Sequence, residues 1–175
     1  MVEGAVAYYQ ATGKRNFLDI AIRYADCVCK NIGEGPGQKR VIPGHQIAEM
    51  ALVRLYTVTG DKKYLDQAQK VYNFIFNNKN LPEDLVPYWD YDAPNIPNEP
   101  RDASAAACTA SALYELDGYL PGNHYKETAD KIMESLGSPA YRAKVGTNGN
   151  FILMHSVGSI PHGQEIDVPL NYADY

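Results

Sequence analysis

The sequence has few cysteines and no metal-ligand spacing. Its three cysteines, Cys27, Cys29 and Cys108, are an odd number, which excludes a framework held only by disulfides. Cys27 and Cys29 lie two positions apart on a predicted helix, where side chains diverge by about 200°. We therefore interpret all three as buried or partly buried free thiols, with a metal site as the weaker alternative. We expect no metal and no cofactor.

Basic clusters and long apolar runs are also lacking. The chain has 16 Lys and Arg against 21 Asp and Glu, and its net charge of −5 disfavours a nucleic-acid surface. No apolar run approaches the roughly 20 residues of a membrane-spanning helix. No basic segment followed by an apolar run opens the chain. We expect a soluble protein that binds neither nucleic acid nor membrane, and its cellular location stays open.

A thirteen-residue pattern occurs twice in the chain. Tyr9–Ala21 returns as Tyr56–Ala68, 47 residues further on, with Tyr, Thr, Gly, Leu, Asp and Ala in register. A period of this length is typical of a repeated helical hairpin, in a closed ring or an open solenoid. A chain of 175 residues has room for roughly three to four such hairpins.

Apolar residues at helical spacing predict the helices themselves. Gly13 and Gly60 are expected to end the helices before them, and Asp102 is placed to cap a helix of small residues. The helix after Gly13 is expected to carry Phe17, Ile20, Ala21, Tyr24 and Val28 on one face. The segments with this spacing are 2–9, 17–28, 47–56, 64–76, 103–113 and 125–136. They alternate as the inner and outer helices of a toroid do.

The pattern changes after residue 150. The apolar segments 151–154 and 166–168 predict a short hairpin or an extended loop, and residues 170–175 are expected to open one more helix. We expect both ends of the chain to lie within helices.

The Pro-rich loop 79–101 and the helix start that follows it contain candidate ligand contacts. Trp89 with Asp90 combines an aromatic face with hydrogen-bond acceptors, as sugar binding requires, although a plug over the helix ends is the alternative. Arg101 with Asp102 suits a carboxylate or hydroxyl ligand, and a capping Asp with a neighbouring Arg salt bridge is the alternative.

His45 is a candidate substrate ligand or general acid–base residue, against a structural histidine. His155 and His162 lie near Ser156, but no acid has the spacing of a triad. Glycosidases usually need two carboxylates that flank the scissile bond. The sequence supports no specific pair, so the catalytic residues stay unknown.

Several stretches of residues 1–69 resemble one known family. They are Val2–Arg15, the Gly35–Gly37 loop, Pro43-Gly44-His45 with Glu49, and Leu55–Asp61. They resemble bacterial β-L-arabinofuranosidases of a family once known only as a domain of unknown function. This resemblance implies a six-hairpin α/α toroid with added β domains, and a sugar contact for His45. The family's catalytic cysteine, the zinc ligands beside it and its acid glutamate lie downstream of the matching stretches.

Residues 70–175 carry a different resemblance, in Trp89–Pro94, Pro100–Ala107, His155–Val157, and Asp167–Leu170 with Tyr172–Tyr175. These motifs are similar to the unsaturated glucuronyl hydrolases, which are bacterial six-hairpin toroids too. The two essential aspartates of that family lie upstream of the part present here. Some members recognise substrate sulfate through a Ser-x-x-Ser-x-Lys motif. Ser156 and Ser159 match its serines, and Pro161 stands where the motif has Lys.

The predicted fold class is all-α, with helical hairpins forming about half of an (α/α)6 toroid and a short β-hairpin near the C-terminus. We expect one domain over residues 1–175, with an arabinofuranosidase-like segment 1–69 and a glucuronyl-hydrolase-like segment 70–175.

The predicted function is that of a glycoside-hydrolase-type domain for unsaturated glucuronyl oligosaccharides, weak or inactive as this chain alone. The alternative is a non-enzymatic helical scaffold or chimeric fragment that self-assembles. We expect a homodimer, because exposed inner helices need a partner. The predicted substrate-binding residues are His45, Trp89, Asp90, Arg101, Asp102, Ser156 and Ser159.

Overall fold

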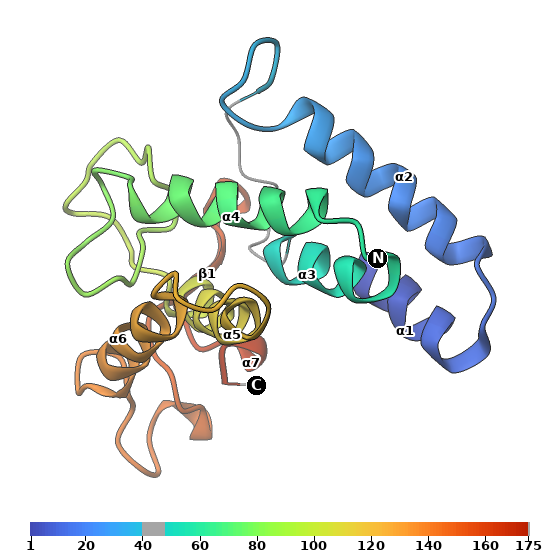
Figure 1. Ribbon diagram of the computed structural model, residues 1–175. Coiled ribbons are helices and arrows are strands. Elements are labelled where there is room, and N and C mark those ends of the chain that lie inside the picture. The colour runs from blue at the N-terminus through green and yellow to red at the C-terminus, as the bar shows by residue number, and fades with distance from the viewer. Residues whose placement is uncertain (40–47, 175) are drawn as a thin grey trace. The chain divides into compact units, whose positions relative to one another are not determined.

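The computed structural model describes residues 1–39 and 48–174, which divide into two compact units, Met1–Ile75 and Phe76–Tyr175 (Figure 1). The helices predicted from apolar spacing are all present. The first unit contains α1 (Val2–Thr12), α2 (Asn16–Asn31), α3 (Ala48–Thr59) and most of α4 (Lys63–Phe76). The second contains α5 (Ala103–Tyr119), α6 (Tyr125–Gly137), β1 (Ser156–Ser159), β2 (Gln164–Val168), α7 (Asn171–Asp174) and the 3-10 turns Asn148–Asn150 and Ile160–His162.

The two copies of the sequence repeat form the same turn between helices. Gly13 and Gly60 end α1 and α3 in the left-handed region, with φ of 68° and 69°. Glycine adopts this conformation without a Cβ clash. Each glycine N–H donates to the carbonyl oxygen four residues back, at 2.7 and 2.8 Å. The preceding Thr12 and Thr59 hydroxyls also donate four residues back, at 2.7 and 2.8 Å. The repeat in sequence is therefore a repeat in local geometry.

The second helix of each copy buries matching positions, although the predicted face of α2 was partly wrong. Leu18 of α2 and its counterpart Leu65 of α4 are both buried. The structure also buries Ala25 of α2, but it leaves Ile20 and Tyr24 48% and 52% exposed. Since α2 packs chiefly on α1, only a narrow stripe of its surface is covered.

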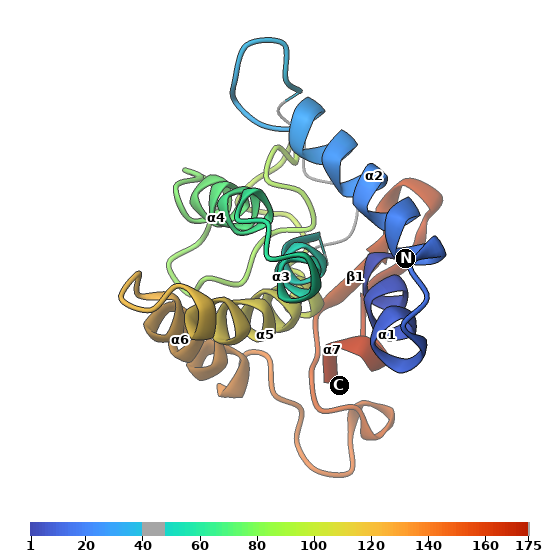
Figure 2. The same ribbon diagram turned by 45° about the vertical axis from the view of Figure 1, so that its right-hand side comes forward.

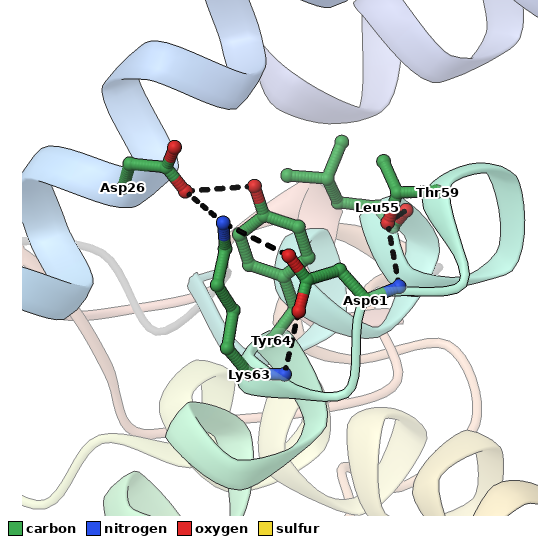
Figure 3. A network of polar contacts seen from close by, with 6 residues as sticks. All are labelled: Asp26, Leu55, Thr59, Asp61, Lys63 and Tyr64. Carbon is green, nitrogen blue, oxygen red and sulfur yellow. Dashed lines mark hydrogen bonds and ion pairs between the residues drawn. The ribbon is translucent and has the colours of Figure 1, made fainter.

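A polar network ties α2 to the start of α4 within the first unit (Figure 3). The Lys63 Nζ lies 2.8 Å from Asp26 Oδ1 and 2.9 Å from Asp61 Oδ2. The Tyr64 hydroxyl donates to the same Asp26 oxygen at 2.8 Å. Burial, aided by the hydrogen bond to Asp26, raises the pKa of Tyr64 to about 12. Each of these four side chains therefore has a polar partner inside the unit.

In the second unit, α5 and α6 lie side by side, and β1 and α7 also pack against α5 (Figures 1 and 2). Small residues make this close packing possible, since Ala103, Ala106 and Ala110 of α5 are buried. α6 buries Tyr125, Ala129, Ile132 and Leu136 of its predicted stripe, but Met133, which was also predicted on that face, is 48% exposed.

The predicted C-terminal hairpin is confirmed, but its first strand begins later than expected. β1 and β2 are antiparallel, with Ser156 opposite Val168. The apolar segment 151–154 is no strand of this hairpin. It pairs instead with the segment after α6 through an antiparallel bridge between Leu153 and Arg142, and the Asp174 carboxylate accepts the N–H groups of residues 152 and 153 at 2.7 and 2.9 Å. Apolar composition does not show which segment an extended stretch pairs with.

The three cysteines, all within the described residues, form no disulfide, and Cys29 and Cys108 are partly buried. Cys27 is exposed, so the expectation of burial was wrong there. No group of three or more His, Cys, Asp or Glu within residues 1–39 and 48–174 is arranged to hold a metal ion. Across those same ranges, no helix combines the length and the apolar character that crossing a bilayer requires.

Candidate functional site

Asp102 stands at the N-terminal end of α5, where its predicted capping role is confirmed. Its Oδ1 accepts the backbone N–H groups of Ser104 and Ala105 at 3.0 and 3.3 Å. The same oxygen accepts the Ser104 hydroxyl at 2.6 Å and the N–H of Val157 in β1 at 3.3 Å. One carboxylate oxygen thus joins the helix to the hairpin.

The other oxygen of Asp102 is left uncommitted. No hydrogen bond from the described residues reaches Oδ2, since all four bonds end on Oδ1. Burial raises the pKa of this carboxyl group, and the hydrogen bonds from Ser104 and Val157 oppose that rise only in part. The arrangement fixes the orientation of the carboxyl group and leaves one oxygen to interact with a ligand.

Tyr172 of α7 brings a phenol to the same end of α5. Its phenol lies near enough to Ser104, Asp102 and Glu165 for these groups to influence its pKa. Burial raises the pKa of Tyr172, although 47% of the residue's surface is exposed. Tyr172 is not among the substrate contacts that the sequence predicts. The signal that pointed to it was its place in a motif shared with the glucuronyl hydrolases.

Arg101 belongs to a separate network. Its guanidinium group pairs with the Asp84 carboxylate and donates to the Val86 carbonyl oxygen, at 2.9 Å from Nε and 2.6 Å from Nη2. The other Asp84 oxygen accepts the Tyr141 hydroxyl at 2.8 Å. Two tyrosine rings lie 5.0 and 6.0 Å from the guanidinium carbon. The salt bridge considered for Arg101 is therefore formed with Asp84.

The base of the 79–101 loop connects these groups. The N–H of Trp89 donates to the Pro100 carbonyl oxygen at 3.0 Å. The N–H of Asp102 donates to the Pro87 carbonyl oxygen at 2.8 Å. The N–H of residue 103 donates to the His155 carbonyl oxygen at 2.9 Å. Loop, helix start and hairpin start thus form one hydrogen-bonded framework.

Trp89 and Asp90 are held by polar groups of their own loop. The partly exposed Trp89 donates its indole N–H to Glu99 Oε2 at 2.8 Å. The exposed Asp90 carboxylate accepts the backbone N–H of Asp92 at 2.7 Å. The loop is therefore ordered by hydrogen bonds around the two predicted sugar contacts.

The two serines of the hairpin differ. Ser156 is 0% exposed, and its Oγ has no hydrogen-bond partner within the part of the chain that the structure describes. A buried hydroxyl without a partner is unfavourable, so this one stands out. The Ser159 hydroxyl lies 2.7 Å from Nδ1 of His162. His45 lies outside the described residues.

The family model described as "Beta-L-arabinofuranosidase, GH127 catalytic domain" matches residues 1–133. The chain belongs to this family. The match extends past residue 69, where the sequence analysis ended the arabinofuranosidase-like segment. The division of the chain at that point stays a prediction.

The second resemblance is found in sequence and in structure. An unsaturated glucuronyl hydrolase of Formosa agariphila is 47% identical over 120 residues, which cover 69% of this chain and 30% of that protein. A crystal structure of an unsaturated glucuronyl hydrolase specific for heparin superposes with a TM-score of 0.89 and 33% identity, over 99% of this chain and 54% of its own. The chain therefore spans about a third of the first relative and about half of the second.

A further solved structure, an unsaturated glucuronyl hydrolase from Streptococcus agalactiae, is complexed with dGlcA-GalNAc6S. It superposes with a TM-score of 0.82 over 99% of this chain and 54% of its own, and at 21% identity it shows the fold alone. These comparisons confirm both resemblances and the fold class, helical hairpins of the α/α-toroid type with a short β-hairpin. They also confirm a domain of glycoside-hydrolase type.

Proposed function

We propose that this chain binds unsaturated glucuronyl oligosaccharides at the N-terminal end of α5 and hydrolyses them weakly or not at all as this chain alone. The observation that carries the proposal is the Asp102 carboxyl group, which is anchored through Oδ1 and uncommitted at Oδ2. Beside it stands the Tyr172 phenol, whose pKa is influenced by Ser104 and Asp102. Together they offer a hydroxyl group and a carboxyl oxygen to a sugar.

The chemistry of these groups suits a polar sugar ring. Oδ2 of Asp102 accepts a hydrogen bond from a sugar hydroxyl. Because burial raises its pKa, the carboxyl group keeps its proton to a higher pH than an ordinary Asp and also serves as a donor in mild acid. Trp89 adds an aromatic face on which the C–H surface of a sugar stacks.

The other predicted contacts have different roles in this proposal. Arg101 acts indirectly, because its guanidinium group is occupied by Asp84 and Val86. Asp90, Ser159, Ser156 and His45 remain proposed contacts on the strength of the two resemblances. We also infer weak or absent catalysis from the two resemblances. The catalytic residues that they imply lie outside the stretches of this chain that resemble each family.

Binding and turnover of dGlcA-GalNAc6S test the proposal. We expect calorimetry to detect binding, and we expect little or no loss of the ultraviolet absorbance of the unsaturated uronide. Asp102→Asn is the matched variant, since the amide oxygen keeps the capping bonds. No binding of this disaccharide, of other unsaturated glucuronides or of arabinofuranosides would favour the alternative, a non-enzymatic helical scaffold.

We also propose that the chain forms a homodimer. Support comes from the half-exposed Ile20 and Tyr24 on α2. Burial of these exposed apolar side chains against a second copy favours pairing. Light scattering at micromolar concentration tests this, and a monomer there would contradict it.

A further inference from the structure

Trp89 is held at two points, through its backbone and through its indole ring. Its backbone N–H donates to the Pro100 carbonyl oxygen at 3.0 Å, and its Nε1–H donates to Glu99 Oε2 at 2.8 Å. Trp89 is the single tryptophan of the chain. The residue is partly exposed, and its indole N–H has a fixed partner.

Glu99 is itself held in place. Its second oxygen, Oε1, accepts the backbone N–H of Asn95 at 3.0 Å and the Asn95 side-chain amide at 3.1 Å. The hydrogen bond from Trp89, followed by those from Asn95, lowers the pKa of this carboxyl group below its usual range. Glu99 therefore remains a carboxylate, the form that accepts both sets of hydrogen bonds.

A charged acceptor is the stronger partner for an indole N–H, which can only donate. A tryptophan side chain turns about two bonds, and a hydrogen bond at the far edge of the ring removes most of that freedom. A ring already fixed before a ligand arrives loses less conformational entropy on binding.

We propose that Glu99 is a positioning residue that orients the Trp89 ring for stacking against a sugar ring of the ligand. The inference rests on the proposed function, because it assigns Trp89 to the same oligosaccharide. Glu99 does not touch the ligand. It acts through the indole N–H, and the Asn95 bonds keep its carboxylate in place.

Three variants separate positioning from a general effect on the loop. Glu99→Ala removes both sets of hydrogen bonds, and Glu99→Asp keeps the charge but shortens the reach to the indole. Glu99→Gln keeps one oxygen acceptor, which serves the indole when the amide nitrogen faces Asn95. Glu83→Gln is the control, because Glu83 is an exposed carboxylate of the same segment. Thermal unfolding followed by circular dichroism shows which variants are folded.

Two readouts are needed. Ultraviolet resonance Raman and time-resolved anisotropy report the hydrogen bond and the motion of the single tryptophan, and calorimetry reports binding of dGlcA-GalNAc6S. We expect Glu99→Ala and Glu99→Asp to break the indole hydrogen bond, speed ring motion and weaken binding about tenfold. Glu99→Gln should stay within about threefold of the wild type, and Glu83→Gln should match it. If Glu99→Ala does not fold, Glu99→Asp carries the test.

The outcomes separate this inference from the proposed function. If the wild type binds the disaccharide and a Glu99 variant with a broken indole bond binds it equally well, positioning by Glu99 is wrong while the proposed function stands. If the wild type binds neither this disaccharide nor other unsaturated glucuronides or arabinofuranosides, both are wrong. A binding loss with an unchanged indole signal would also overturn the inference, because the effect would not pass through Trp89.

Discussion

The polar network of the first unit and the N-terminal end of α5 use similar side chains in opposite ways. Around Lys63, each carboxylate, ammonium and phenol has a partner (Figure 3). At the end of α5, Asp102 leaves one oxygen uncommitted, and the nearby Ser156 hydroxyl is buried without a partner in the described residues. Satisfied networks stabilise a fold, whereas we propose that the groups left without a protein partner at the end of α5 serve a ligand.

The largest stability effect is expected for Asp102→Ala. The change removes the cap of α5 and leaves the N–H of Val157 without its acceptor. We expect a loss of about 2–3 kcal/mol in the free energy of unfolding, measured by urea denaturation. Asp102→Asn keeps the acceptor oxygen and should lose less than about 1 kcal/mol. Equal losses for the two variants would show that the capping bonds contribute little.

A smaller effect is expected for Tyr64→Phe in the first unit. The variant keeps the buried ring and removes the hydroxyl that donates to Asp26 at 2.8 Å. We expect a loss of about 1 kcal/mol, the contribution of an ordinary hydrogen bond, in the same urea experiment. Lys63 still pairs with Asp26 in the variant. An unchanged free energy of unfolding would mean that the network is not stabilising.

Ser156→Ala is expected to change stability in the opposite direction. Removing a buried hydroxyl that has no partner in the described residues should raise the free energy of unfolding by up to about 1 kcal/mol. If Ser156 contacts the ligand as proposed, binding of dGlcA-GalNAc6S should weaken in the same variant. A clear loss of stability would show that the hydroxyl is paired in solution.

The smallest effect concerns pH. Burial raises the native pKa of Asp102 above its unfolded value, so the native state binds more protons between the two values. The proton-linked part of the contribution of Asp102 to stability is present below the unfolded pKa and is lost as pH rises through the native pKa. The difference in unfolding free energy between wild type and Asp102→Asn should therefore change in that interval. A difference that is independent of pH, or of opposite sign, would contradict the raised pKa.

Local features of the fold could be predicted from the sequence. The repeat predicted two equivalent turns, because Gly13 and Gly60 each follow a Thr whose hydroxyl bonds within its own helix. The cap at Asp102 was predictable because Asp is a preferred residue at the start of a helix. The exposed side of α2 was not predictable from the sequence. Whether Ile20 and Tyr24 are buried or exposed depends on which neighbouring helix covers α2.

The candidate site was predictable only in part, because its remaining groups meet over long sequence distances. The partner of Arg101 is Asp84, and Asp84 is shared with Tyr141, 57 residues away. Tyr172 reaches the start of α5 through the packing of α7. Glu99 lies ten residues from Trp89, and only the folded loop brings its carboxylate to the indole. Side-chain contacts of this kind leave no periodic signal in the sequence.

The dissociation constant of dGlcA-GalNAc6S for Asp102→Asn and for Tyr64→Phe, beside the wild type, tests the central contrast most directly. Each protein is compared at conditions where it is fully folded. We predict that Asp102→Asn weakens binding about tenfold and that Tyr64→Phe leaves it unchanged. Equal binding by all three proteins, or an equal loss in both variants, would contradict the account.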